Sequence, residues 1–281
     1  MTVWQKMAFA AGLVAAIVGA GAVLLRPPAA PPGAGAGAKM PVLLTHLQRL
    51  LFVQGEQLQY RIDVNGVQVG SLRSVVPPGD RDANWPPLVL EYEVQPVPTV
   101  DSIWRFSASG RTVMNPATLV PHTSESTTRK GDREKRVSTT LDQKTGIATV
   151  TEWDSDTGET ESKEVRFDLG LDVPAAFLFV RISKMPPGSP RKLTVLKGDD
   201  RYEVTFTAVG TGPVEVAAGA FDAIEVQLHL RKLADAGEGS ERGEDDYREV
   251  RLWLSEQGRV PLKVESPILG GTLRAELVAR K

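Results

Sequence analysis

The sequence predicts a mainly β protein, in which an antiparallel meander forms an open barrel or two packed sheets. The first observation behind this prediction is the alternation of apolar and polar residues with a period of two, which is typical of half-buried strands and runs through much of the chain after residue 55. The second is the regular spacing of turn signals such as Asn65-Gly66 and Lys144-Thr145-Gly146. Together they favour successive hairpins, with one helix in mid-chain and a membrane or signal helix at the N-terminus.

The N-terminal helix is predicted from an unbroken apolar run over residues 7–25, flanked by Lys6 and Arg26. Two interpretations remain open for residues 1–26. They are a signal peptide cleaved at Ala20-Gly21-Ala22, or a retained signal anchor whose 19 residues match a bilayer core of about 30 Å. Both place the rest of the chain in the periplasm or cell envelope, and the second anchors it in the inner membrane.

Residues 27–39 contain only Pro, Ala and Gly apart from Lys39, and this composition is typical of an extended spacer. Residues 40–281 are expected to form a single β-rich envelope domain, which is long enough to bury a large core. At its start, residues 42–51 carry leucines spaced by three and four, as in a short amphipathic helix.

Within this domain the alternation predicts a series of strands. A loop is expected at residues 129–135, and Gly210-Thr211-Gly212 is expected to turn the chain between strands. The helix in mid-chain is predicted over residues 174–184, because Pro174 suits a first helical turn and Pro186-Pro187-Gly188 ends the pattern. The predicted strands are 56–64, 67–76, 88–94, 118–128, 136–141, 147–153, 164–169, 193–196, 202–209, 224–231, 250–254, 260–264 and 273–277.

Composition excludes several classes of function. With 33 Lys and Arg against 35 Asp and Glu, the formal net charge of −2 gives no field that would attract nucleic acid. The absence of cysteine excludes disulfides, thiolate metal sites and thiol nucleophiles. His46, His122 and His229 lack the spacing of metal ligands, so no metal and no cofactor are expected.

Catalytic patterns are also missing from the sequence. It has no G-x-S-x-G elbow and no Gly-rich phosphate loop followed by a helix. Asp154 and Asp156 flank a predicted turn, where Asp is favoured because its side chain bonds the nearby backbone. We therefore expect a protein that is not an enzyme.

The densest cluster of positive charge lies within residues 129–136, where Asp132 and Glu134 dilute it. This pattern is typical of a solvent-exposed hairpin tip, and a contact with phosphate headgroups or an acidic partner is the alternative.

Aromatic residues indicate where a ligand would bind. Trp253 lies on the strand face opposite Leu252 and Leu254, so it lines a cavity, a second packed layer or an interface. Trp253, Trp104 and Phe177 form the candidate ligand or interface surface. The function expected is binding of an apolar or amphiphilic ligand, a lipid or a glycan, on a curved sheet. The alternative is a structural or assembly adaptor, tethered to the membrane by its N-terminal helix and bound to an envelope protein.

The order of several short motifs resembles a family of exported bacterial proteins catalogued only as a domain of unknown function. The resemblance covers roughly residues 55–278. It implies a β-rich, periplasmic or envelope-associated protein, and it supplies no established activity and no functional residues. The motifs are Gly55-Glu56-Gln57-Leu58-Gln59-Tyr60, Asn65-Gly66, Val69-Gly70, a helix ending near Arg181, Pro187-Gly188, Gly219-Ala220-Phe221-Asp222-Ala223-Ile224, Trp253-Leu254-Ser255 and Arg259-Val260-Pro261-Leu262.

Overall fold

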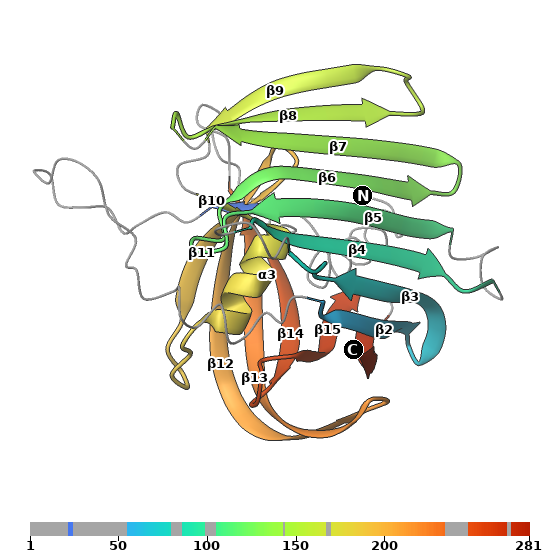
Figure 1. Ribbon diagram of the computed structural model, residues 1–281. Coiled ribbons are helices and arrows are strands. Elements are labelled where there is room, and N and C mark those ends of the chain that lie inside the picture. Colours follow the sequence, from blue (N-terminus) through green and yellow to red (C-terminus); the bar gives the residue numbers. More distant parts are fainter. Residues whose placement is uncertain are drawn as a thin grey trace, which may run out of the picture.

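The computed structural model describes residues 22–24, 55–79, 86–98, 105–142, 144–166, 170–233, 247–268 and 271–281. These residues form strands and one helix, α3 (Val173–Ile182) (Figure 1). The strands are β1 (Ala22–Leu24), β2 (Gln57–Val64), β3 (Val67–Val75), β4 (Leu88–Pro96), β5 (Phe106–Met114), β6 (Pro121–Lys130), β7 (Arg133–Asp142), β8 (Ile147–Asp154), β9 (Thr160–Arg166), β10 (Gly170–Asp172), β11 (Arg191–Lys197), β12 (Asp200–Val216), β13 (Gly219–Lys232), β14 (Tyr247–Ser255), β15 (Pro261–Ile268) and β16 (Gly271–Arg280).

All the described strands belong to one 16-stranded sheet in the order β1-β10-β11-β12-β13-β14-β15-β16-β2-β3-β4-β5-β6-β7-β8-β9. It consists of two antiparallel meanders, β2 to β9 and β11 to β16, joined where β16 pairs with β2. The Asn65-Gly66 turn between β2 and β3 forms as predicted, and both residues have the positive φ that a two-residue hairpin requires. The predicted mainly β, antiparallel meander is confirmed, and it is a single open sheet.

The sheet is strongly curled, and Figure 1 shows its two meanders at a steep angle with α3 in the angle between them. The strands β1 and β9 are the two ends of the strand order and do not pair with each other. The β9 end of the sheet nevertheless comes close to β11, near the β1 end. Lys163 on β9 forms an ion pair of 2.9 Å with Asp199, in the turn between β11 and β12. Leu196 of β11 packs with Leu141 and Ala148 across the same gap.

Helix α3 forms where the sequence predicts a helix. Asp172 caps its N-terminus, since its carboxylate accepts a hydrogen bond from the backbone N–H of Ala175, and Pro174 lies in the first turn. At the other end, the Ser183 hydroxyl donates to the carbonyl of Phe179 at 2.7 Å. Most of α3 is buried against the apolar face of the sheet. In the part of the chain that the structure describes, no helix combines the length and apolar character that a membrane crossing needs.

The C-terminal end of α3 is fixed by a buried ion pair. The Arg181 guanidinium contacts both carboxylate oxygens of Glu56, with Nη1–Oε2 at 2.9 Å and Nη2–Oε1 at 3.2 Å. The two side chains are only 1% and 2% exposed. Arg181 Nε also donates to the carbonyl of Arg259 at 2.9 Å, and Arg280 approaches Glu56 at 3.4 Å. Three motifs distant in sequence therefore meet at the end of one helix.

The N-terminal end of α3 is fixed to β5 and β6, in the meander that runs from β2 to β9. Asp172, which is fully buried, accepts hydrogen bonds from the Thr112 hydroxyl of β5 and the Ser124 hydroxyl of β6. Burial raises the pKa of this carboxyl group to about 6, although these hydrogen bonds oppose the rise.

Three parts of the fold differ from the sequence prediction. Residues 129–135 do not form a loop, because β6 and β7 continue to a tight turn that contains Gly131, whose φ is +62°. Residues 210–212 do not turn the chain, because β12 continues through a bulge at Ala208/Gly210 to Val216. β5 was not predicted at all.

Of the N-terminal residues 1–26, the structure describes only residues 22–24. Ala22–Leu24 form β1, which pairs with the free edge of β10, whereas the apolar pattern assigned these three residues to the end of the N-terminal helix. An edge strand offers unpaired backbone groups that such a segment satisfies. Residues 1–21, the spacer at 27–39 and the leucine-rich segment at 42–51 lie outside the described residues.

Candidate functional site

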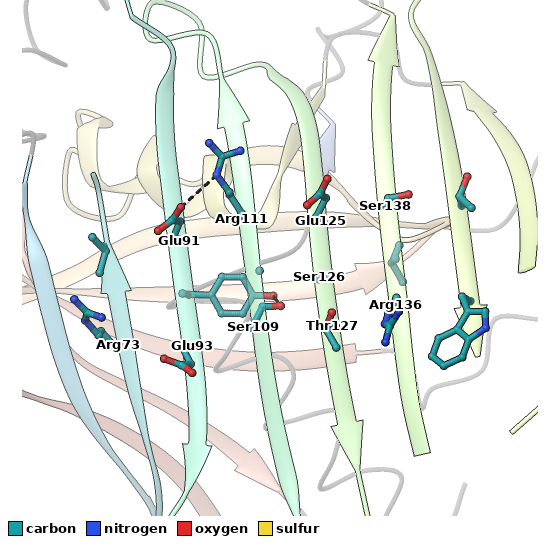
Figure 2. A pocket seen from close by; sticks show the side chains of 16 residues that line it. Arg73, Glu91, Glu93, Ser109, Arg111, Glu125, Ser126, Thr127, Arg136 and Ser138 are labelled. Atoms are coloured by element: carbon teal, nitrogen blue, oxygen red, sulfur yellow. Dashed lines mark hydrogen bonds and ion pairs between the residues drawn. The ribbon is translucent and has the colours of Figure 1, made fainter. Parts of the chain in front are cut away.

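One hollow of the sheet, on the face turned away from α3, is lined by many polar side chains. This hollow, which we call the polar hollow, has a volume of about 630 Å³ and extends over β3 to β8 (Figure 2). Its lining residues are Arg73, Val75, Glu91, Tyr92, Glu93, Ser109, Gly110, Arg111, Glu125, Ser126, Thr127, Arg136, Val137, Ser138, Thr151 and Trp153.

The strand register explains how these residues come together. Each of the six strands contributes one residue to each of two parallel rows of directly opposed residues. Neighbouring strands lie about 4.8 Å apart, so a row over six strands is roughly 24 Å long. The first row is Val75, Glu91, Arg111, Glu125, Ser138 and Thr151, and the second is Arg73, Glu93, Ser109, Thr127, Arg136 and Trp153.

Charge in the polar hollow is balanced. The lining contains three arginines and three glutamates, which alternate in sign within each row. Arg111 Nε lies 3.2 Å from Glu91 Oε1, and Arg73 Nη2 donates to the side-chain oxygen of Gln57 at 3.0 Å. Opposed charges on neighbouring strands stabilise the sheet. Because the charges cancel, the polar hollow does not favour a strongly anionic or cationic ligand.

Hydroxyl groups and one indole make up much of the remaining lining. Ser109 and Thr127 lie side by side in the second row, and Thr151 ends the first row next to the indole of Trp153. Trp153 is half-buried, and the Arg136 guanidinium lies 4.7 Å from the centre of its ring. An aromatic ring beside neutral donors and acceptors can hold a flat, hydroxyl-rich molecule.

The backbone beneath the polar hollow is shaped by a close contact between Tyr92 and Gly110. A Cβ atom on Gly110 would lie only 2.3 Å from the Tyr92 ring, so the ring occupies the space of the missing side chain. The Tyr92 hydroxyl donates to the carbonyl of Ser109 at 3.0 Å, and burial raises the pKa of this hydroxyl. The charge of Asp172, which caps α3 on the other side of the sheet from the polar hollow, adds to this rise.

The three aromatic residues of the candidate surface are not brought together. Trp253 is 6% exposed and lies under two cations, with Arg251 at 4.7 Å and Lys263 at 3.9 Å from its ring centre. Phe177 belongs to α3 and is buried in the core. Trp104 lies outside the described residues.

The arginines of the charged hairpin at residues 129–136 form ion pairs with acidic residues of the same sheet. Arg129 and Arg136 both contact Glu134, and Arg133 contacts Asp154. Hydrogen bonds from these arginines lower the pKa of Glu134 and of Asp154. Asp154 also accepts from the backbone N–H of Asp156, as expected for Asp in a turn.

A second hollow of about 640 Å³ lies between the β12–β13 hairpin, the turn after β14, and β16. Its lining includes Phe221, Val260, Val278 and Arg280. Among the described residues, no group of three or more His, Asp or Glu side chains could hold a metal ion.

Comparison with known proteins identifies the family. The chain belongs to the family described as "Protein of unknown function (DUF3108)", whose model matches residues 59–278. The resemblance seen in the sequence motifs is thereby confirmed. No curated protein sequence matches the chain.

Several solved structures are similar at low identity. A β-barrel-like protein of the domain of unknown function DUF1849 from Brucella abortus has a TM-score of 0.47 and 10% identity, over 82% of this chain and 98% of that one. A protein with a YmcC-like fold from Bacteroides fragilis has a TM-score of 0.35 and 13% identity, over 82% and 96% of the two chains. The hypothetical lipoprotein YmcC from Escherichia coli has a TM-score of 0.32 and 9% identity, over 84% and 89%.

Proposed function

We propose that this protein is a non-enzymatic binding protein of the cell envelope, and that it holds an extended, uncharged glycan chain in the polar hollow. The observation that carries this proposal is the pair of residue rows across β3 to β8. The length of each row, roughly 24 Å, suits a polymer better than a compact molecule. Their balanced charge, hydroxyl groups and Trp153 suit neutral sugars.

A glycan is favoured over a lipid because of where the apolar residues lie. In the described part of the chain, α3 and the core side chains fill the inside of the curled sheet. A lipid tail would need a continuous apolar surface, whereas the apolar groups that line the polar hollow are interrupted by arginines, glutamates and hydroxyls. The envelope location rests on the apolar leader and the Pro/Ala/Gly spacer of residues 27–39.

Binding without catalysis is proposed because of where the carboxyl groups of Asp172 and Glu91 lie and what they contact. General acid catalysis on a glycan needs a carboxyl with a raised pKa that can touch the substrate. The pKa of Asp172 is raised to about 6, but this residue is fully buried beneath the opposite face of the sheet. In the polar hollow, Glu91 is instead paired with Arg111.

Isothermal titration of the full chain with defined neutral oligosaccharides of two to eight sugars tests this function. Affinity should rise with chain length until the rows are filled. Trp153→Ala and Thr127→Val should each weaken binding at least tenfold, and Thr207→Val, on β12 away from the polar hollow, should leave it unchanged. Absence of saturable binding to every oligosaccharide, or equal affinity of the Thr127→Val and Thr207→Val variants, would refute the proposal.

A second candidate, the membrane-tethered adaptor, is favoured by the free edge of β9. This strand ends the sheet order, so within the described residues its outer edge has no paired strand and could add one from a partner. A photo-crosslinker at Ser162 on β9 distinguishes the two functions in intact cells. Crosslinking to one envelope protein supports the adaptor, and an unmodified chain argues against it.

A further inference from the structure

Helix α3 connects the two meanders through polar contacts at its two ends. At its N-terminal end, the capping residue Asp172 accepts hydrogen bonds from Thr112 on β5 and Ser124 on β6. At its C-terminal end, Arg181 bonds Glu56, next to β2, and the carbonyl of Arg259, in the turn between β14 and β15 of the other meander. A ten-residue helix is a stiff rod of about 15 Å. The helix therefore holds two distant parts of one curled sheet at a fixed separation.

The two ends are held by different chemistry. At the C-terminal end the guanidinium of Arg181 and the carboxylate of Glu56 face each other in a bidentate geometry. Removing one partner of such a buried pair leaves the other charge without compensation, which is strongly unfavourable. This end is a fixed attachment.

At the N-terminal end Asp172 is surrounded by neutral donors. These are the hydroxyls of Thr112 and Ser124 and the backbone N–H of Ala175. The titratable group that faces it is Tyr92, on β4, which stays neutral because burial raises its pKa. On β5 and β6 the neighbouring charged residues, Arg111 and Glu125, point to the opposite face and line the polar hollow.

An ionised Asp172 is thus a buried negative charge held by hydrogen bonds without a cation. Its hydrogen bonds and the helix N-terminus favour the ionised form, but loss of hydration outweighs them. Opening of the contact between α3 and β5–β6 restores water to the carboxylate. Opening is therefore easier when Asp172 carries its charge than when it carries a proton.

We propose that α3 is a brace between the two meanders, fixed by Arg181 at one end and attached at the other by a pH-sensitive anchor at Asp172. In acid the anchor is closed. Near neutral pH the N-terminal half of α3 opens more often from β5 and β6, while the Arg181 end stays in place. Helix α3 contacts β5, one of the strands of the polar hollow, but the inference is independent of what binds there.

Hydrogen-exchange mass spectrometry on the full chain at pH 5.0 and pH 7.5 tests the anchor, after correction for intrinsic exchange rates. With a pKa of about 6 in the folded protein and 3.8 when exposed, protection of residues 173–178 should fall about tenfold between the two pH values. Asp172→Asn should abolish this fall, because Asn caps a helix about as well as Asp and does not titrate.

Two further variants separate an effect of the Asp172 charge from a general loosening of α3. Thr112→Val removes a hydroxyl that favours the charged carboxylate, so it should enlarge the fall in protection. Ser183→Ala loosens the other end of α3 and should reduce protection of residues 179–182 equally at both pH values. The proposal is overturned if wild-type protection at residues 173–178 is the same at both pH values. It is also overturned if Asp172→Asn keeps the tenfold fall, or if Thr112→Val leaves the fall unchanged.

Discussion

Glu56 and Arg181, 125 positions apart in sequence, form a bidentate ion pair in which both side chains are almost entirely buried. Both residues belong to the motifs by which the sequence resembles its family, and the carbonyl of Arg259, from a third motif, completes the contact. Three of the sequence motifs shared with the family therefore contribute residues that meet at one place in the core.

Replacing Arg181 alone tests this pair. Arg181→Met should lower the free energy of unfolding by about 3–5 kcal/mol, because the Glu56 carboxylate remains buried without its main partner. Adding Glu56→Leu should recover most of the loss, since neither charge is then buried. Urea unfolding followed by circular dichroism measures both variants. A double variant no more stable than the single one would contradict this account.

Tyr60 gives a test of a single buried hydrogen bond. Its hydroxyl donates to the carbonyl of Pro261 at 3.0 Å, and burial raises the pKa of this hydroxyl. Tyr60→Phe should reduce stability by about 1 kcal/mol because the carbonyl loses its donor. Tyr202→Phe is the matched control, since the Tyr202 hydroxyl bonds the more accessible Asp200. A larger loss in the control, measured by urea unfolding, would show the assignment to be wrong.

Gly110 is expected to tolerate no side chain. Gly110→Ala places a methyl group 2.3 Å from the Tyr92 ring, and displacing this ring should lower stability by roughly 1–3 kcal/mol. Gly212→Ala is the control, because its Cβ would meet nothing within 4 Å. Thermal unfolding compares the two variants. Similar melting temperatures would mean that Tyr92 does not fill the space above Gly110.

The dependence of stability on pH should carry the signature of Asp172. Because burial raises its pKa in the folded protein to about 6 from 3.8, its contribution to stability is present in acid and is lost as the pH rises through 6. Relative to Asp172→Asn, the wild-type protein should lose about 3 kcal/mol of stability between pH 3.5 and pH 7.5. Urea unfolding at several pH values measures the difference. A constant difference, or one that grows in the other direction, would exclude the buried carboxyl as its source.

Much of the fold could be predicted from local patterns. The alternation over residues 56–64 and the Asn65-Gly66 turn gave β2, its hairpin and β3, and Pro174 marked the start of the helix in mid-chain. β5 was missed because its core-facing positions include Ala108, Gly110 and Thr112, whose small or polar side chains do not show an apolar alternation. The turn at Gly131 was missed because charged residues on both faces of a hairpin resemble a loop until their ion pairs are seen.

The candidate site could not be predicted in the same way. Arg73 and Trp153 belong to one row only because six strands pair in a particular register, and no local pattern encodes that register. Trp153 could be recognised in the sequence as a large aromatic residue, but no sequence pattern predicted that it would share a row with Thr127 and Ser109. The burial of Asp172 is a tertiary effect as well, since Asp172 lies on β10 and its partners Thr112 and Ser124 lie on β5 and β6.

The pairing of β16 with β2 has a consequence for how the molecule is made. The strand β2 pairs with β16, which is synthesised long after it, and the two meet through contacts such as Ala275 opposite Ile62. Each meander can assemble from neighbours in sequence, but the seam between them closes only after residues 271–280 have been synthesised. A product that stops short of residue 271 would present two unjoined edges to the surrounding solution, and such edges promote aggregation.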